Sequence, residues 1–401
     1  MGKNYKGRLL RIIVISILLV LIQPCFTLSA HAEEDFDSEA VMEEQAGNGE
    51  IGKLEDQLEK HSNEDIRDIV GDYSPQKLIK DTANGRFRLN MAEIVKRAMQ
   101  YLFKEIYLNI HIMIKLILLT VLCAVLRNLQ ASFLSESVGE LAFYTCYILV
   151  VSVLIVSFSS ALNLGIGIID SMVDFMYAAV PVLITLLVSG GNITSGGVFQ
   201  PILIMMVEVS ATLIKNVFIP LILLSTVLSI VDNISDKVQI SKMAGFLKQV
   251  AGWGLGIILT VFVAVVAVQG SLGAVVDGVA SKTVKYAIGA FIPVVGKCLS
   301  DAADAVLGCT LLIKNAAGIA AMIGIIVICL VPILKIVALI VLYRLVCMLI
   351  EPISEKRLVN TINEVAGSMT YILGVTASVA FMFLLSITAI ISASNLSAMV
   401  R

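Results

Sequence analysis

The sequence predicts an all-α, polytopic membrane protein with about six full spans, two re-entrant or interfacial segments and an internal two-fold repeat. Two features of composition and one of pattern predict this fold class. Hydrophobic residues make up 58% of the 401 residues and charged residues only 15%, whereas soluble domains are about half apolar and a quarter charged. Mean hydropathy is +0.93, and apolar runs of helical length recur along the chain. Most of the chain therefore contacts lipid.

The same composition argues against several classes of function. The formal net charge of −2 provides no general attraction to nucleic acid, and the seven cysteines form no C-x-x-C pair of the kind that binds zinc. The sequence contains no phosphate-binding glycine loop, no H-E-x-x-H and no G-x-S-x-G. We therefore expect no enzyme activity, no catalytic residue, no metal and no cofactor.

The amino terminus has the pattern of a signal peptide over residues 1–32. Basic residues precede an apolar run at 12–22, which is about 17 Å long as a helix and too short for the ~30 Å hydrocarbon layer. Ala30 and Ala32 then supply the small-x-small pattern that signal peptidase recognises. We expect cleavage after Ala32, which leaves the mature amino terminus outside the cytoplasm.

Residues 33–107 are expected to form an extracytoplasmic segment that is acidic at first and then basic. Residues 33–72 contain fifteen acidic and three basic side chains, and residues 77–104 contain two acidic and seven basic ones. The acidic part is either a solvated tail or a docking arm for a basic partner. A capping box at Asn90–Glu93 begins a predicted helix, which we expect to lie on the membrane surface. Its predicted apolar face consists of Met91, Ile94, Val95, Ala98, Leu102 and Ile106.

Six apolar stretches are long enough to cross a bilayer. They lie near 108–126, 139–162, 198–231, 251–270, 316–343 and 369–393. The first two precede the predicted repeat and occupy residues 108–163. Two shorter apolar stretches, 175–189 and 286–296, are centred on Pro181 and Pro293. We expect these prolines to break the helices, a pattern that is typical of re-entrant or interfacial segments.

The basic residues support this topology in part. With the mature amino terminus outside, residues 127–138, 232–250 and 351–368 face the cytoplasm, and each carries Lys or Arg, as the positive-inside rule requires. The stretch at 271–315 is the weak point, because it is predicted outside and yet contains Lys282 and other lysines. The span count therefore stays between about six and eight.

Short motifs recur in the same order in residues 164–270, membrane repeat 1, and 271–401, membrane repeat 2. A proline-centred stretch comes first in each repeat. Next come Lys215 in one and Lys335 in the other, followed by a connector with an Ile-Ser-acid-Lys core. We predict duplication of one unit, with both copies oriented the same way. The alternative is chance similarity among stretches rich in Leu, Ile and Val.

The stretch at 198–231 would measure about 51 Å as a single helix, longer than the hydrocarbon layer. It must tilt, protrude or break, and Asn216 with Pro220 marks the place where we expect a break. The same geometry would also arise from two short hairpin helices, which would change the span count.

Ionisable residues inside apolar spans are costly unless they are paired. The candidates for a polar path in the membrane are Lys115, Asp170, Asp174, Glu208, Lys215 and Lys335. Two interpretations stay open. One is a polar path or ion site between the repeats, and the other is pairing between helices together with lysines that extend to the membrane interface.

The layout resembles that of the stage III sporulation protein AE family of endospore-forming Firmicutes. The resemblance rests on the signal peptide, the acidic and then basic segment, and the polytopic core with its connectors Asp232–Lys237 and Glu351–Lys356. It implies a multi-pass protein of the mother-cell membrane around the forespore. The partners it implies are the other membrane proteins of the stage III A operon, the ATPase of that operon and, indirectly, the forespore stage II protein Q. It also implies a channel or secretion-like complex, and it supplies no catalytic residues.

Three roles are compatible with these features. The chain is the gate or conduit of a multi-protein machine, a secondary permease for a small solute with Glu208, Lys215 and Lys335 near its site, or a passive assembly scaffold. The long extracytoplasmic segment at 33–107 favours the first role, because a simple permease rarely needs one. In each role the chain contacts the lipid bilayer and no nucleic acid.

Overall fold

The computed structural model of the chain describes residues 91–133, 136–234, 240–291 and 295–400, which are helical almost throughout and contain no strand. The helices are α6 Met91–Leu108, α7 Ile110–Phe133, α8 Glu136–Ser189, α9 Ile193–Leu213, the π-helix η2 Ile214–Phe218, α10 Ile219–Asp232, α11 Ser241–Phe291, α12 Val295–Ile350 and α13 Lys356–Val400. The predicted all-α class is therefore confirmed for the described residues.

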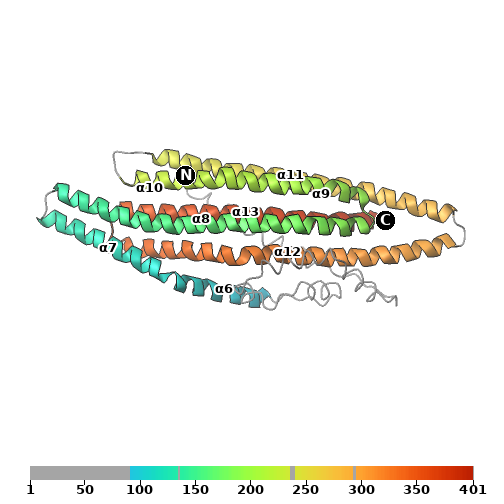
Figure 1. Cartoon of the computed structure of the whole chain (residues 1–401), viewed down its shortest axis with the longest axis horizontal. Coiled ribbons are helices and arrows are strands. Elements are labelled where there is room, and N and C mark those ends of the chain that lie inside the picture. The colour runs from blue at the N-terminus through green and yellow to red at the C-terminus, as the bar shows by residue number, and fades with distance from the viewer. Residues whose placement is uncertain (1–90, 134–135, 235–239, 292–294, 401) are drawn as a thin grey trace.

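The helices lie side by side along one long axis and form an elongated bundle (Figure 1). Consecutive passes run in opposite directions, with α9, η2 and α10 together making one pass. The carboxyl ends of α7, α10 and α12 and the amino ends of α8, α11 and α13 all lie at one end of the bundle. These ends flank the three stretches that the sequence assigns to the cytoplasm. The turn from α8 to α9, the carboxyl end of α11 and the amino end of α12 lie at the opposite end.

Five helical segments are long and apolar enough to cross a membrane. They are Tyr144–Ser189, Ile193–Asp232, Ser241–Gly270, Gly308–Ile350 and Lys356–Ala393. A sixth span is added if α6 and α7, which meet at a bend of 44°, are counted as one broken span. The longest segment has 46 residues, or about 69 Å of helix against a hydrocarbon layer of about 30 Å. These helices therefore tilt strongly or extend beyond the lipid.

The structure corrects the prediction for residues 175–189. These residues form no separate re-entrant element, because α8 continues through Pro181 to Ser189. A proline inside a helix removes one backbone hydrogen bond and crowds one carbonyl. Here buried side chains on both sides of Pro181, Val180 and Val182 among them, hold the helix in place. Packing therefore outweighs the local preference for a break.

Several predictions fall on residues that the structure does not describe. The predicted signal peptide with Ala30 and Ala32, and the acidic and basic parts of 33–90, lie outside the described residues. Pro293 also lies outside them, between the end of α11 and the start of α12. The prediction that it breaks a helix therefore stays a prediction.

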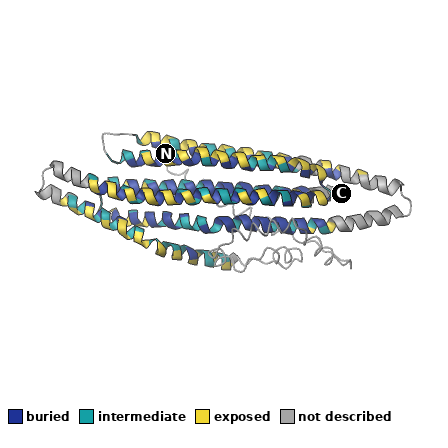
Figure 2. Cartoon of the chain, viewed as in Figure 1, coloured by how far each residue is buried: buried dark blue, intermediate teal, exposed yellow. Residues whose placement is uncertain are grey.

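The centre of the bundle is formed by α12 and α13 together with α8 (Figure 2). In the most apolar window of each span, 56% of residues are buried in α12 and 61% in α13, against 17% in α11. Polar contacts add to this core at the end where the connectors lie. The hydroxyl of Tyr147 on α8 donates to the carbonyl of Ile230 on α10 at 3.0 Å and lies 2.8 Å from the Thr361 hydroxyl on α13. These contacts tie three passes together.

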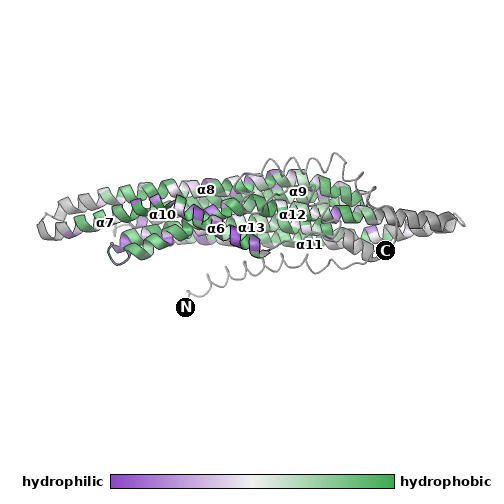
Figure 3. Ribbon diagram, turned by 90° about the horizontal axis from the view of Figure 1, so that it is seen from below, coloured by the Kyte–Doolittle hydropathy of each residue, from purple (hydrophilic) through white to green (hydrophobic). Residues whose placement is uncertain are grey.

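Helix α6 forms as predicted, and its buried face agrees in part with the predicted one: Ala98 packs against the cluster of Tyr101, and Ile94, Leu102 and Ile106 are half-buried. Tyr101 packs in a small cluster with Val327 and Val331 of α12, whereas Val95 of the predicted apolar face is 58% exposed. The aromatic ring buries more area than Val95 would, and it selects the contact with α12. Hydrophobic residues make up most of the coloured ribbon in Figure 3, and several hydrophilic residues lie close together on α6.

Candidate polar strip in the membrane

One face of α8 carries polar side chains at intervals of three and four residues, which places them above one another on the helix. We call this set the α8 polar strip; it consists of Ser159, Ser160, Asn163, Asp170, Ser171, Asp174 and Tyr177. All seven are exposed or half-buried. The strip is about 27 Å long, close to the thickness of the hydrocarbon layer, and it lies in the middle of the span Tyr144–Ser189.

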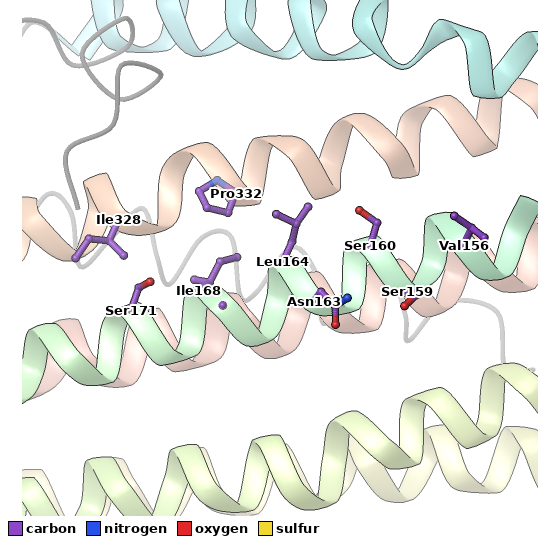
Figure 4. A pocket seen from close by; sticks show the side chains of 10 residues that line it. Val156, Ser159, Ser160, Asn163, Leu164, Ile168, Ser171, Ile328 and Pro332 are labelled. Atoms are coloured by element: carbon purple, nitrogen blue, oxygen red, sulfur yellow. The ribbon is translucent and has the colours of Figure 1, made fainter. Parts of the chain in front are cut away.

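A cavity of about 600 Å³ lies beside the first part of the strip, between α8 and α12. Figure 4 shows the side chains of Ser160, Asn163 and Ser171 along α8, with Ile328 and Pro332 facing them from α12. Pro332 has no N–H to donate to the carbonyl of Ile328, four residues earlier in the helix. Polar side chains of α8 therefore border the cavity on one side, and Ile328 and Pro332 of α12 border it on the other.

The second part of the strip faces η2. The ammonium of Lys215 donates a hydrogen bond to a carboxylate oxygen of Asp170, and both side chains stay partly exposed. Lys215 lies within the π-helix, where the N–H of Ile219 donates to the carbonyl of Ile214, five residues back. Pro220 explains this turn, because it lacks an N–H and its ring crowds the carbonyl of Asn216. The irregularity thus lies where the sequence predicts it, as a wide turn within a continuing helix.

A second polar contact lies next to this ion pair. The hydroxyl of Tyr177 on α8 donates to one carboxylate oxygen of Glu208 on α9 at 2.5 Å, and Thr212 donates to the other at 3.4 Å. Asp174, one turn before Tyr177, is exposed. The cluster thus holds the carboxylates of Asp170, Asp174 and Glu208 against the single ammonium of Lys215 and is net negative. It is suited to attract a cation or the basic side chain of a partner.

The predicted site residues divide into two groups. The structure brings Asp170, Glu208 and Lys215 to the boundary between α8 and the α9–η2 pass, as the two preceding contacts show, and Asp174 lies on α8 between Asp170 and Tyr177. The other two candidates lie elsewhere in the bundle. Lys335 is half-buried on α12, one turn beyond Pro332, and Lys115 is exposed on α7, whose main contacts are with α8 and α12.

Neutral members of the strip were missed by the sequence analysis. These five residues carry no charge and had not been named as candidates: Ser159, Ser160, Asn163, Ser171 and Tyr177. Their spacing of three, four and seven residues would have indicated that they share one face of a helix. Within the described residues, no three His, Cys, Asp or Glu side chains are grouped so that they could hold a metal ion. The strip therefore offers hydrogen-bonding groups and charge.

Comparisons with known proteins give matches that cover almost the whole chain. A family model described as stage III sporulation protein AE matches residues 73–394, a range that contains the entire α8 polar strip. A protein of Bacillus subtilis (strain 168) with the name stage III sporulation protein AE is 31% identical over 394 residues, which cover 97% of this chain and 98% of that protein. No solved structure matches.

Proposed function

The chain belongs to the stage III sporulation protein AE family, and from this premise we propose that it is a membrane subunit of a channel or secretion-like complex between mother cell and forespore. Within that complex it serves as gate, conduit or core assembly subunit, in the mother-cell membrane and with its mature amino terminus outside the cytoplasm. It has no enzyme activity of its own. A secondary permease for a small solute is not favoured, because the matching family is a sporulation family.

The observation that carries this proposal is the outward-facing α8 polar strip. A charged side chain at the centre of a bilayer costs about 2.5 to 3.5 kcal/mol on insertion scales, and Asp174 and Glu208 are both exposed on the surface of the bundle. Contact with lipid over the length of the strip would therefore be costly. The strip faces either water or a polar surface of another subunit, and both arrangements require assembly beyond one chain.

The neutral part of the strip favours water over a tightly packed partner. Hydroxyl and amide groups line the cavity of about 600 Å³ beside Asn163, and a cavity with several polar groups is of a kind that holds water. We propose that the strip lines one wall of a water-filled path. Partner subunits, which we propose to be the other membrane proteins of the stage III A operon, supply the remaining walls. The ATPase of that operon supplies energy, and the forespore stage II protein Q is contacted indirectly.

We also retain the proposal that residues 164–270 and 271–401 are duplicated units. The carboxyl ends of α10 and α12 lie at the same end of the bundle, which supports two copies with one orientation. Lys248 of the first unit donates to Glu364 of the second at 2.6 Å. This ion pair connects the two units near that end of the bundle.

Cysteine accessibility tests the water-filled path. The chain with Asn163→Cys, assembled in sporulating cells, is exposed to a positively charged, membrane-impermeant thiol reagent. The matched control is Ile257→Cys, at a 62% exposed apolar position of α11, and the unsubstituted chain corrects for the native cysteines. We expect labelling of Asn163→Cys and none of Ile257→Cys. If both stay unlabelled, the strip is covered by a dry interface and the conduit proposal fails.

A further inference from the structure

A second cavity of about 600 Å³ lies between α9 and α11, which run side by side in Figure 1. It is separate from the α8 polar strip and shares no lining residue with it. Seven of its ten lining residues are apolar: Val198, Phe199, Ile202, Ala264, Val265, Val268 and Val276. The other three are Thr194, Ser195 and Gln269. An apolar cavity of this size with a few polar groups is typical of a small-molecule site.

Two of its polar side chains are buried without hydrogen-bond partners among the described residues. The hydroxyl of Ser195 is fully buried, and Gln269 is 8% exposed; neither the Ser195 oxygen nor either amide atom of Gln269 has a partner. Buried polar groups in folded proteins are almost always paired, and leaving them unpaired is costly. The Ser195 hydroxyl, which can donate and accept, and the Gln269 amide, with its NH2 donor and its carbonyl acceptor, therefore lie without partners in the wall of a largely apolar cavity.

The charge beside the cavity selects against an anionic ligand. Asp277 of α11 is 2% exposed, and its two carboxylate oxygens accept the backbone N–H groups of Thr194 and Ser195 at 2.9 and 2.8 Å. The first turn of α9 is the position where a phosphate would otherwise bind. Because the chain fills that position with its own carboxylate, a ligand phosphate would meet a negative charge. This carboxylate therefore disfavours an anionic ligand, and the apolar lining favours a neutral one over a cation.

The cavity opens to the surface that faces lipid. Val198, Val268 and Val276 line it and are each about half exposed (49%, 57% and 49%), and α11 is the least buried of the five candidate spans. We propose that this cavity holds an acyl chain of a neutral glycerolipid, which enters from the bilayer. The amide of Gln269 donates to the ester carbonyl, and the Gln269 carbonyl and Ser195 hydroxyl receive the glycerol hydroxyl.

Native mass spectrometry of the purified full-length chain in detergent tests this site. The protein is incubated with dioleoylglycerol or, at equal concentration, with anionic dioleoylphosphatidylglycerol. We expect one dioleoylglycerol per chain to survive transfer and the anionic lipid to bind no better than background. Gln269→Leu keeps the side-chain size but removes the hydrogen bonds, and it should weaken retention about fivefold.

A pair of phenylalanine variants separates the cavity from general lipid contact. Ala264→Phe places a ring in the cavity and should abolish retention. Val261→Phe adds the same ring one turn away on α11, at a 51% exposed position that does not line the cavity, and it should leave retention unchanged. Equal retention by both variants, preference for the anionic lipid, or no lipid retained by the unsubstituted chain would each overturn the proposal.

Discussion

The ammonium of Lys215 in η2 donates to the carboxylate of Asp170 in α8, a residue 45 positions earlier in the chain. This pair joins two consecutive passes at mid-length of the span Tyr144–Ser189. Lys215 reaches Asp170 from a π-turn, and such turns are frequent at functional sites. The local break in helix geometry and the ion pair are therefore parts of one arrangement.

A double-mutant cycle on Asp170 and Lys215 measures what this contact contributes. Each single change, Asp170→Asn or Lys215→Met, leaves one charge without its partner in an apolar span, and each should lower the apparent melting temperature of the detergent-solubilised chain. The double variant removes both charges and should recover part of the loss. We expect a coupling energy of about 1 kcal/mol. Additive effects of the two changes would mean that the pair contributes nothing.

Pro220 is predicted to maintain the position of Lys215. Pro220→Ala restores an N–H for the carbonyl of Asn216 and removes the cause of the π-turn. We expect the coupling between Asp170 and Lys215 to fall to near zero in this background. The control is Pro201→Ala, which removes a proline from inside α9, where the helix is regular, and should preserve the coupling. A coupling that survives Pro220→Ala would show that packing alone keeps the turn wide.

The sequence was sufficient to predict the helical class, because apolar runs of 20 residues or so leave few alternatives in lipid. The sequence was also sufficient to single out the charged residues of the strip, Asp170 and Asp174, because charged residues are rare inside apolar spans. The sequence was not sufficient to predict that α8 continues through Pro181, because the packing of buried neighbours decides whether a proline ends a helix. The contact of Asp277 with the first turn of α9 joins residues more than 80 positions apart, and no local pattern indicates it.

Two glycines of α11 provide a matched test of close helix packing. A Cβ added at Gly254 would lie 2.4 Å from the ring of Phe218 in η2, whereas one added at Gly256 meets nothing within 4 Å. Gly254→Ala should therefore destabilise the chain by about 1 to 3 kcal/mol through overpacking. Gly256→Ala should stabilise it by up to about 1 kcal/mol, because alanine favours the helix. Apparent melting temperatures in detergent should move in opposite directions, and equal shifts would contradict the close contact.

Positions 282 and 356 test which end of the bundle faces the cytoplasm. Residue 282 lies late in α11 and Lys356 begins α13, and the carboxyl end of α11 and the amino end of α13 lie at opposite ends of the bundle (Figure 1). The predicted signal peptide places residue 282 outside, and the basic connectors place Lys356 inside. Lys282→Cys should react with an impermeant thiol reagent added to intact cells. Lys356→Cys should react only after the membrane is permeabilised. If only the Lys356→Cys chain reacts in intact cells, the predicted topology is wrong and the end of the bundle where α13 begins faces the outside.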